Sequence, residues 1–233
     1  ALVTVPSFFL STSIRDVFFQ RAGALAASGG DIAELLETVA KRLTQIIILP
    51  MIMLGLIGTD IFVIVAGKEW LEAGIYTRLL APWLCVGFVS FPMSVMFPIM
   101  NKQDVQLVYN IALFIVRIAA LGIAGVLSGS PRLAVFLFSM AGVVFNGWSI
   151  VYILMRNGSN VMKFAVTAFV YTLYALPATL ITAAGKWMGG FSPVANIIIG
   201  CITSAGTLVI MMSRDQDFKS FVTDTVNSLR NRR

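Results

Sequence analysis

The feature that most constrains this chain is a series of long apolar runs, each close to 20 residues, separated by short polar turns. About 20 helical residues cross the hydrocarbon core of a membrane, and only helices or closed barrels satisfy the backbone there. Barrel strands show alternating segments of about 10 residues, whereas these runs are continuous. The sequence therefore predicts an all-α protein that crosses a membrane several times.

The predicted membrane-spanning helices are seven in number and follow one another closely. We place them at about 2–22, 43–66, 79–100, 105–127, 133–155, 162–184 and 192–212. The turns between them are too short to hold a second domain, so we expect one transmembrane helix bundle over 1–213. In the remaining tail, 214–233, apolar residues recur at helical spacing and arginines end the chain. This pattern predicts a basic amphipathic helix on the inner leaflet, and the alternative is a solvated tail.

The composition excludes several classes of protein. Hydrophobic residues make up 58% of the chain, and charged residues only 12%, against about 25% in typical soluble domains. The net charge is +6, but the basic residues are spread through the loops, so nucleic-acid binding is not expected. The chain has no histidine, which is the commonest metal ligand and general base, and we predict neither a metal nor a cofactor.

Lysine and arginine are divided unequally between alternate loops, and loops rich in these residues stay in the cytoplasm. One side collects Arg15, Arg21, Lys41, Arg42, Lys102, Arg156, Lys163, Arg214, Lys219, Arg230, Arg232 and Arg233, and the other has Lys68, Arg78, Arg132 and Lys186. We therefore expect the C-terminus in the cytoplasm and the N-terminal end outside.

One charge, Arg117, falls in the middle of a predicted span. Placing it in lipid would cost between about 2.5 and well over 10 kcal/mol, so it is expected to face a cavity or a partner. Gln106 and Asn110 precede it on the same helix face. Arginine stays protonated and can fork onto phosphate, which makes these three side chains candidates for binding an anionic substrate. The alternative role for Arg117 is a buried salt bridge or a clamp on backbone carbonyls.

Three more polar residues inside predicted spans are candidates for function. Asn146 is expected to line a cavity or to form a hydrogen bond between helices. Tyr171 shares a helix face with Tyr174 and is a further candidate for substrate binding. Asp60 is the one carboxylate well inside a predicted span. It is expected to bind a coupling ion, to pair with a basic residue or to lie in a water-filled vestibule.

Three stretches of the chain resemble a known family of membrane proteins. They are VFFQRAGAL at 17–25, VAGKEWLEAGIYTRLLAPW at 65–83 and NKQ at 101–103. These stretches are similar to polysaccharide biosynthesis proteins of the Wzx-like type, within the multidrug/oligosaccharidyl-lipid/polysaccharide exporter superfamily. The middle run is the most specific of the three.

The resemblance implies a transporter and not an enzyme. Such proteins flip undecaprenyl-pyrophosphate-linked glycans across the bacterial cytoplasmic membrane, and two helix bundles, often of seven helices each, surround a central cavity. The predicted spans would correspond to the eighth to fourteenth helices of that plan. The expected partners are therefore the lipid-linked glycan, membrane lipids and an N-terminal bundle of the same protein that precedes this chain.

Two other functions stay open. A cation-coupled exporter of drugs or other small molecules, from the same superfamily, needs a buried carboxylate that exchanges its ion for substrate, and Asp60 is the one candidate. A membrane glycan polymerase or transferase needs acids or histidines at a membrane face, commonly in a sizeable loop. The sequence offers neither a histidine nor a long outer loop.

Overall fold

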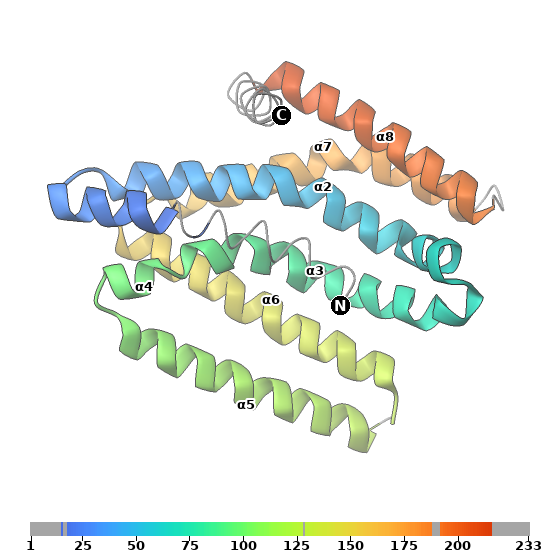
Figure 1. Cartoon of the computed structure of the whole chain (residues 1–233), viewed down its shortest axis with the longest axis horizontal. Coiled ribbons are helices and arrows are strands. Elements are labelled where there is room, and N and C mark those ends of the chain that lie inside the picture. The colour runs from blue at the N-terminus through green and yellow to red at the C-terminus, as the bar shows by residue number, and fades with distance from the viewer. Residues whose placement is uncertain (1–14, 16–17, 128, 188–191, 216–233) are drawn as a thin grey trace, which may run out of the picture.

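The computed structural model describes residues 15, 18–127, 129–187 and 192–215, which are almost entirely helical and include no strand. The elements are α2 (Ile32–Ala66), the 3-10 turn η1 (Lys68–Trp70), α3 (Leu71–Met93), α4 (Met96–Ile99), α5 (Gln103–Leu127), α6 (Pro131–Arg156), α7 (Val161–Trp187) and α8 (Pro193–Arg214) (Figure 1). Residues 18–28 form a further helix before α2. The prediction of an all-α bundle is confirmed.

Six helical segments in the described ranges are long and apolar enough to cross a membrane, and α3 and α4 together count as one of them. They correspond to six of the seven predicted spans. The first predicted span, 2–22, lies mostly outside the described residues, and so does the predicted tail helix beyond residue 215. The structure therefore bears on the bundle and not on these two terminal segments.

The start of α2 differs from the prediction, which began the span at 43. The helix begins at Ile32 because Asp31 caps it: the Asp31 carboxylate accepts a hydrogen bond from the Glu34 backbone N–H at 3.1 Å. The extra turns carry Glu34, Glu37 and Lys41. These charged residues suit helical turns that lie outside the hydrocarbon core, at the membrane surface. A search for apolar runs does not detect such turns.

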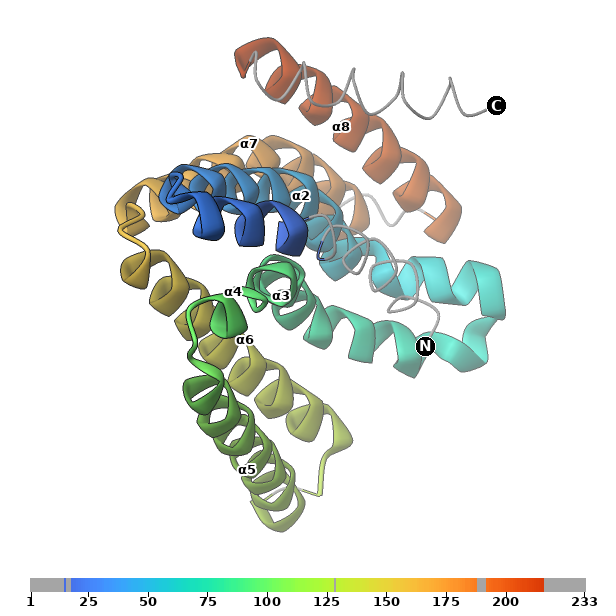
Figure 2. The same cartoon turned by 60° about the vertical axis from the view of Figure 1, so that its left-hand side comes forward.

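The long helices pack in a row whose order differs from their order in the sequence. Neighbouring pairs place α5 beside α6, α6 beside α3, α3 beside α2, α2 beside α7 and α7 beside α8 (Figure 1). Figure 2 shows the row from another side, with α5 and α6 on the opposite side of α2 and α3 from α8. Helices from distant parts of the sequence therefore meet at α2 and α3 in the centre of the row.

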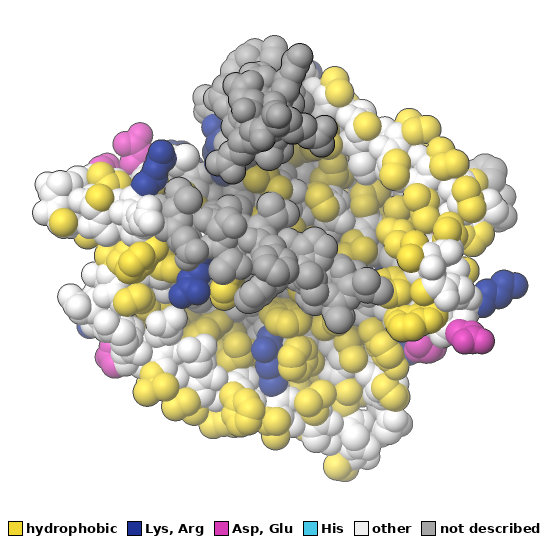
Figure 3. Space-filling model, in the orientation of Figure 1, with side chains coloured by type: hydrophobic (Ala, Val, Ile, Leu, Met, Phe, Trp, Pro, Cys, Tyr) yellow, Lys and Arg dark blue, Asp and Glu magenta, His cyan; other side chains and the backbone are white. Residues whose placement is uncertain are grey.

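Along the helix axes the row has two ends, and they differ in the number of lysine and arginine residues. We call one end the basic end, which carries Lys41, Arg42, Lys102, Arg156, Lys163 and Arg214. The opposite end carries Lys68, Arg78, Arg132 and Lys186. Figure 3 shows a largely apolar face between charged groups at the two ends, interrupted by a few basic side chains. This distribution suits a bundle whose middle lies in hydrocarbon and whose ends reach water.

The largest packed core lies toward the basic end, where the helix at 18–28, α2, α3, α4 and α6 meet. Its fully buried side chains include Leu36, Met93, Met96, Phe97, Ile153 and Leu154. A second, smaller cluster joins α2 to α7 and α8. Both clusters involve α2, so this helix holds the two sides of the row together.

Candidate functional site

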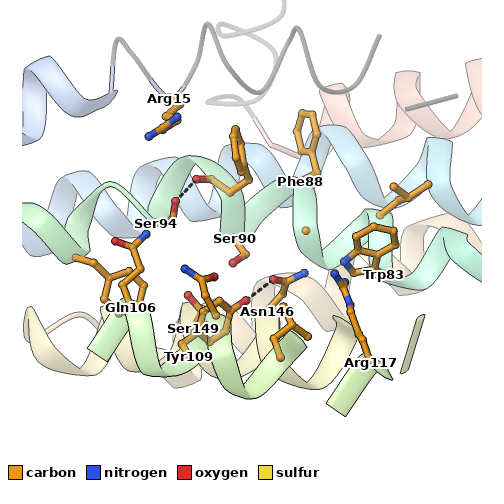
Figure 4. A pocket seen from close by; sticks show the side chains of 16 residues that line it. Arg15, Trp83, Phe88, Ser90, Ser94, Gln106, Tyr109, Arg117, Asn146 and Ser149 are labelled. Carbon is orange, nitrogen blue, oxygen red and sulfur yellow. Dashed lines mark hydrogen bonds between the residues drawn. The ribbon is translucent and has the colours of Figure 1, made fainter. Parts of the chain in front are cut away.

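A cavity of about 540 Å³ lies between α3, α5 and α6 (Figure 4). Its polar lining consists of Arg15, Ser90, Ser94, Gln106, Tyr109, Asn110, Arg117, Asn146 and Ser149. Aromatic and aliphatic side chains, among them Trp83 and Phe88, form the rest of the wall. The lining contains two arginines and no carboxylate within the described residues, which makes the cavity cationic.

Arg117 enters the cavity from the middle of α5 and stacks on two aromatic rings. Its guanidinium carbon lies 4.7 Å from the centre of the Trp83 ring and 4.1 Å from that of Phe138. Its Nε is buried without a hydrogen-bond partner, and no carboxylate pairs with it in the described part of the chain. A desolvated cation–π contact contributes about 2 kcal/mol or more, which offsets only part of the cost that most measures give for a charge at this depth.

The Trp83 ring can pack against α6 because the residue opposite it is Gly142, which has no side chain. A Cβ atom at Gly142 would collide with the Trp83 indole, so only glycine leaves room for the ring there. Trp83 also meets Phe138 edge to face, with 5.4 Å between the ring centres. These contacts fix the aromatic surface on which Arg117 rests, and they hold its guanidinium at the cavity wall.

The sequence prediction grouped Gln106, Asn110 and Arg117 on one helix face, and the structure places all three on the cavity wall. Asn146 lines the same cavity from α6, and its side-chain oxygen accepts a hydrogen bond from the Tyr109 hydroxyl at 2.7 Å. Four candidates therefore lie at one site. Substrate binding by these four residues stays a prediction.

Arg15 and Tyr109 also line the cavity, although sequence reasoning did not select them as site residues. The guanidinium carbon of Arg15 lies 5.4 Å from the centre of the Phe91 ring (Figure 4). A charge inside the predicted span at 2–22 was a signal for Arg15, but its approach to α3 depends on tertiary packing. No sequence pattern distinguished Tyr109 from an ordinary interfacial tyrosine.

Tyr171 lies apart from the other candidates, on the far side of α2 and α3. Its hydroxyl donates a hydrogen bond to the Asp215 carboxylate at 2.6 Å and accepts one from the Gln45 side chain. It lines a smaller cavity of about 370 Å³ with Lys41 and Arg214, among others. The structure therefore does not bring Tyr171 together with the other predicted substrate-binding residues, and its role in substrate binding stays a prediction.

Asp60 pairs with a basic residue, which was one of its three expected roles. Its carboxylate lies 2.6 Å from the Lys186 ammonium of α7, and both side chains are largely buried. Elsewhere in the described ranges, no group of three or more histidine, cysteine, aspartate or glutamate residues is placed to hold a metal ion. The candidate residues thus fall into three places: the cationic cavity, the group of Tyr171, Gln45 and Asp215, which we call the Tyr171 cluster, and this ion pair.

The fold and the charged groups inside it define a multi-pass, all-α membrane protein. Comparison of the chain with protein-family models, with curated proteins and with solved structures finds no match. The function has to be inferred from the cavity and its lining.

Proposed function

We propose that this chain forms one bundle of a flippase that moves an undecaprenyl-pyrophosphate-linked glycan across the bacterial cytoplasmic membrane by alternating access. The observation that supports this proposal is Arg117, a cation held deep in a span, stacked on aromatic rings and without a carboxylate partner in the described residues. A protein gains little stability from such a charge, whereas a phosphate-bearing ligand would supply the missing anion.

The lining suits the two polar parts of such a substrate. Arg117 and Arg15 provide charge for a pyrophosphate, and guanidinium groups can bind phosphate with two parallel hydrogen bonds. The amides of Gln106, Asn110 and Asn146 provide donors and acceptors of the kind that sugar hydroxyls require. A cavity with cations at fixed positions and neutral amides between them would accept a charged headgroup without a metal ion.

The position of α5 accounts for the lipid tail. This helix is the outermost of the row on the cavity side. Its exposed apolar side chains include Leu107, Val108, Ile111, Phe114, Ile115 and Ile118. A headgroup held against α5 would lie next to the bilayer, so its chain could remain in lipid while only the polar part enters the protein.

The orientation of the bundle belongs to the same proposal. The basic end carries six of the ten lysines and arginines assigned to the two ends above, and the positive-inside rule favours that end in the cytoplasm. An N-terminal bundle of the same protein would face the cavity, and rocking of the two bundles would expose it to each side in turn. Transport requires only that the substrate bind the two conformations differently.

The test is Arg117→Ala in the complete transporter. Charged hydrogen bonds contribute about 1.5–3 kcal/mol each, so export of lipid-linked glycan should fall by about 10-fold or more with normal membrane insertion. Arg117→Lys keeps the charge but loses the forked geometry and should give an intermediate rate. Arg132→Ala removes an exposed arginine of α6 that does not line the cavity and serves as the matched control. Undiminished export in Arg117→Ala would overturn the proposal.

A further inference from the structure

The ammonium of Lys186 is surrounded by three oxygen atoms from a single turn of α2. It lies 3.0 Å from the Leu56 carbonyl oxygen, 2.9 Å from the Thr59 hydroxyl and 2.6 Å from an Asp60 carboxylate oxygen. An ammonium group has three N–H donors, and these oxygens account for all of them. The side chains of Asp60 and Lys186 are only 12% and 17% exposed, so this is a largely dehydrated site.

The three oxygens are the kinds of ligand that bind hard metal cations. A carbonyl, a hydroxyl and a carboxylate oxygen at positions i, i+3 and i+4 converge on one face of the helix. Backbone carbonyls of unwound helices coordinate coupling ions in many transporters, and side-chain oxygens are common further ligands of hard cations. The set carries one negative charge, which one monovalent cation neutralises. A divalent ion would leave an excess positive charge in a medium of low dielectric constant.

The oxygens belong to one helix and the ammonium to another. The α2 turn is fixed from the side of α3, where the Arg78 guanidinium donates a hydrogen bond to the Gly55 carbonyl at 2.9 Å. A Cβ atom at Gly74 of α3 would lie 2.6 Å from the Thr59 Cα, so the two helices touch through glycine at this level. The oxygen set would therefore stay assembled if α7 moved away, and only the cation would leave.

We propose that the oxygens of Leu56, Thr59 and Asp60 form a binding site for a monovalent alkali cation such as Na⁺, and that Lys186 occupies it as a tethered substitute. Withdrawal of Lys186 would leave a buried, unpaired carboxylate, which is strongly unfavourable. A cation from solution removes that penalty. Cation binding and separation of α7 from α2 therefore favour each other, as linkage requires.

This inference rests on the proposed function only for the movement of α7, and the cation site itself can be tested without transport. The full chain is purified in lipid nanodiscs, and its thermal midpoint is compared in NaCl and in choline chloride at equal ionic strength. Lys186→Ala empties the site, so NaCl should raise the midpoint of this variant by about 2–4 °C or more. The wild-type chain should respond much less, because Na⁺ has to displace Lys186.

The double variant Asp60→Asn/Lys186→Ala supplies the matched control, and it should lose the difference between the two salts. Equal midpoints of Lys186→Ala in both salts, or the same response in the double variant, would overturn the cation site. A larger response to CaCl₂ than to NaCl at equal ionic strength would overturn the monovalent assignment. If Lys186→Ala is not recovered folded, Lys186→Met, which keeps more of the apolar contact, takes its place in the same comparison.

The cation site and the flippase can fail separately. A Na⁺ response in Lys186→Ala together with undiminished export in Arg117→Ala would keep the cation site and reject the flippase. Loss of export without a Na⁺ response would do the reverse.

Discussion

Positively charged side chains have different partners on the two sides of the helix row. On the α2, α7 and α8 side, Lys186 pairs with Asp60 at 2.6 Å and Lys41 pairs with Asp215 at 3.1 Å. On the α3, α5 and α6 side, Arg117 rests on Trp83 and Phe138 without a carboxylate partner in the described chain. The paired cations connect helices, whereas the cation without a carboxylate remains available to a ligand.

The paired side is tied near both ends of α2. The ion pair of Asp60 connects α2 to α7 toward the opposite end, and that of Lys41 connects it to the end of α8 near the basic end. On the cavity side, α5 is joined to α6 by the hydrogen bond between Tyr109 and Asn146, whose side chains are both neutral. While Lys186 occupies the oxygen set of α2, we expect α2, α7 and α8 to behave as a unit and the cavity side to give way more easily.

The largest effect expected from this difference is at Lys186. Lys186→Met leaves the Asp60 carboxylate buried and unpaired, so the free energy of unfolding should fall by about 3–5 kcal/mol in buffer containing choline as the only added cation. Thermal or denaturant unfolding in nanodiscs measures it. The double variant Asp60→Asn/Lys186→Met removes both charges and should recover most of the loss. If the single variant were as stable as the wild-type chain, the pair would not tie α2 to α7.

A smaller effect is expected at Tyr171, where the paired side depends on hydrogen bonds. Tyr171→Phe removes the hydroxyl that bonds to Asp215 and Gln45, and the loss should be about 1–3 kcal/mol of unfolding free energy. Tyr174→Phe is the matched control, since its hydroxyl makes no hydrogen bond to the described residues. Equal effects of the two substitutions would show that the Tyr171 cluster does not hold α8.

The sequence predicted where the helices begin and end better than it predicted which helices lie side by side. The boundaries of α5 to α8 fell within a few residues, because long apolar runs end at Gly-rich turns and Pro131 and Pro193 occupy first helical turns, where proline is tolerated. The face shared by Gln106, Asn110 and Arg117 followed from helical periodicity alone. These features are local, and local patterns are what a sequence displays.

The partners of single residues were not local and could not be predicted in the same way. Asp60 and Lys186 are 126 positions apart, and nothing near Asp60 indicates which basic residue it meets. Tyr171 and Asn146 both looked like polar residues facing a cavity, but α7 and α6 lie on different sides of α2 and α3. The order of helices in the row decides these contacts, and that order depends on packing across the whole bundle.

Substitution by methionine should change the free energy of unfolding differently at Arg117 than at Lys186. Arg117→Met gives up two cation–π contacts, each worth about 0.5–2 kcal/mol, but removes a charge whose burial costs between about 2.5 and well over 10 kcal/mol. Stability should therefore stay the same or increase, and it should not fall as it does in Lys186→Met. The unfolding assay used for Lys186→Met measures this. A loss as large as that of Lys186→Met would show that Arg117 is held by a carboxylate after all.

The smallest effect is expected at Arg132. It tests whether the strength of an ion pair at this end depends on the burial of the pair or only on its place in the bundle. Arg132 of α6 pairs with Glu72 of α3 at the same end of the row as Lys186, but both side chains are at least half exposed. Exposed pairs are screened by water and salt, so Arg132→Ala should leave the unfolding midpoint unchanged at moderate ionic strength. The expected contrast with Lys186→Met arises because water can solvate Glu72 and cannot reach most of Asp60. A midpoint lowered as far as that of Lys186→Met would mean that ion pairing at this end stabilises the bundle regardless of burial.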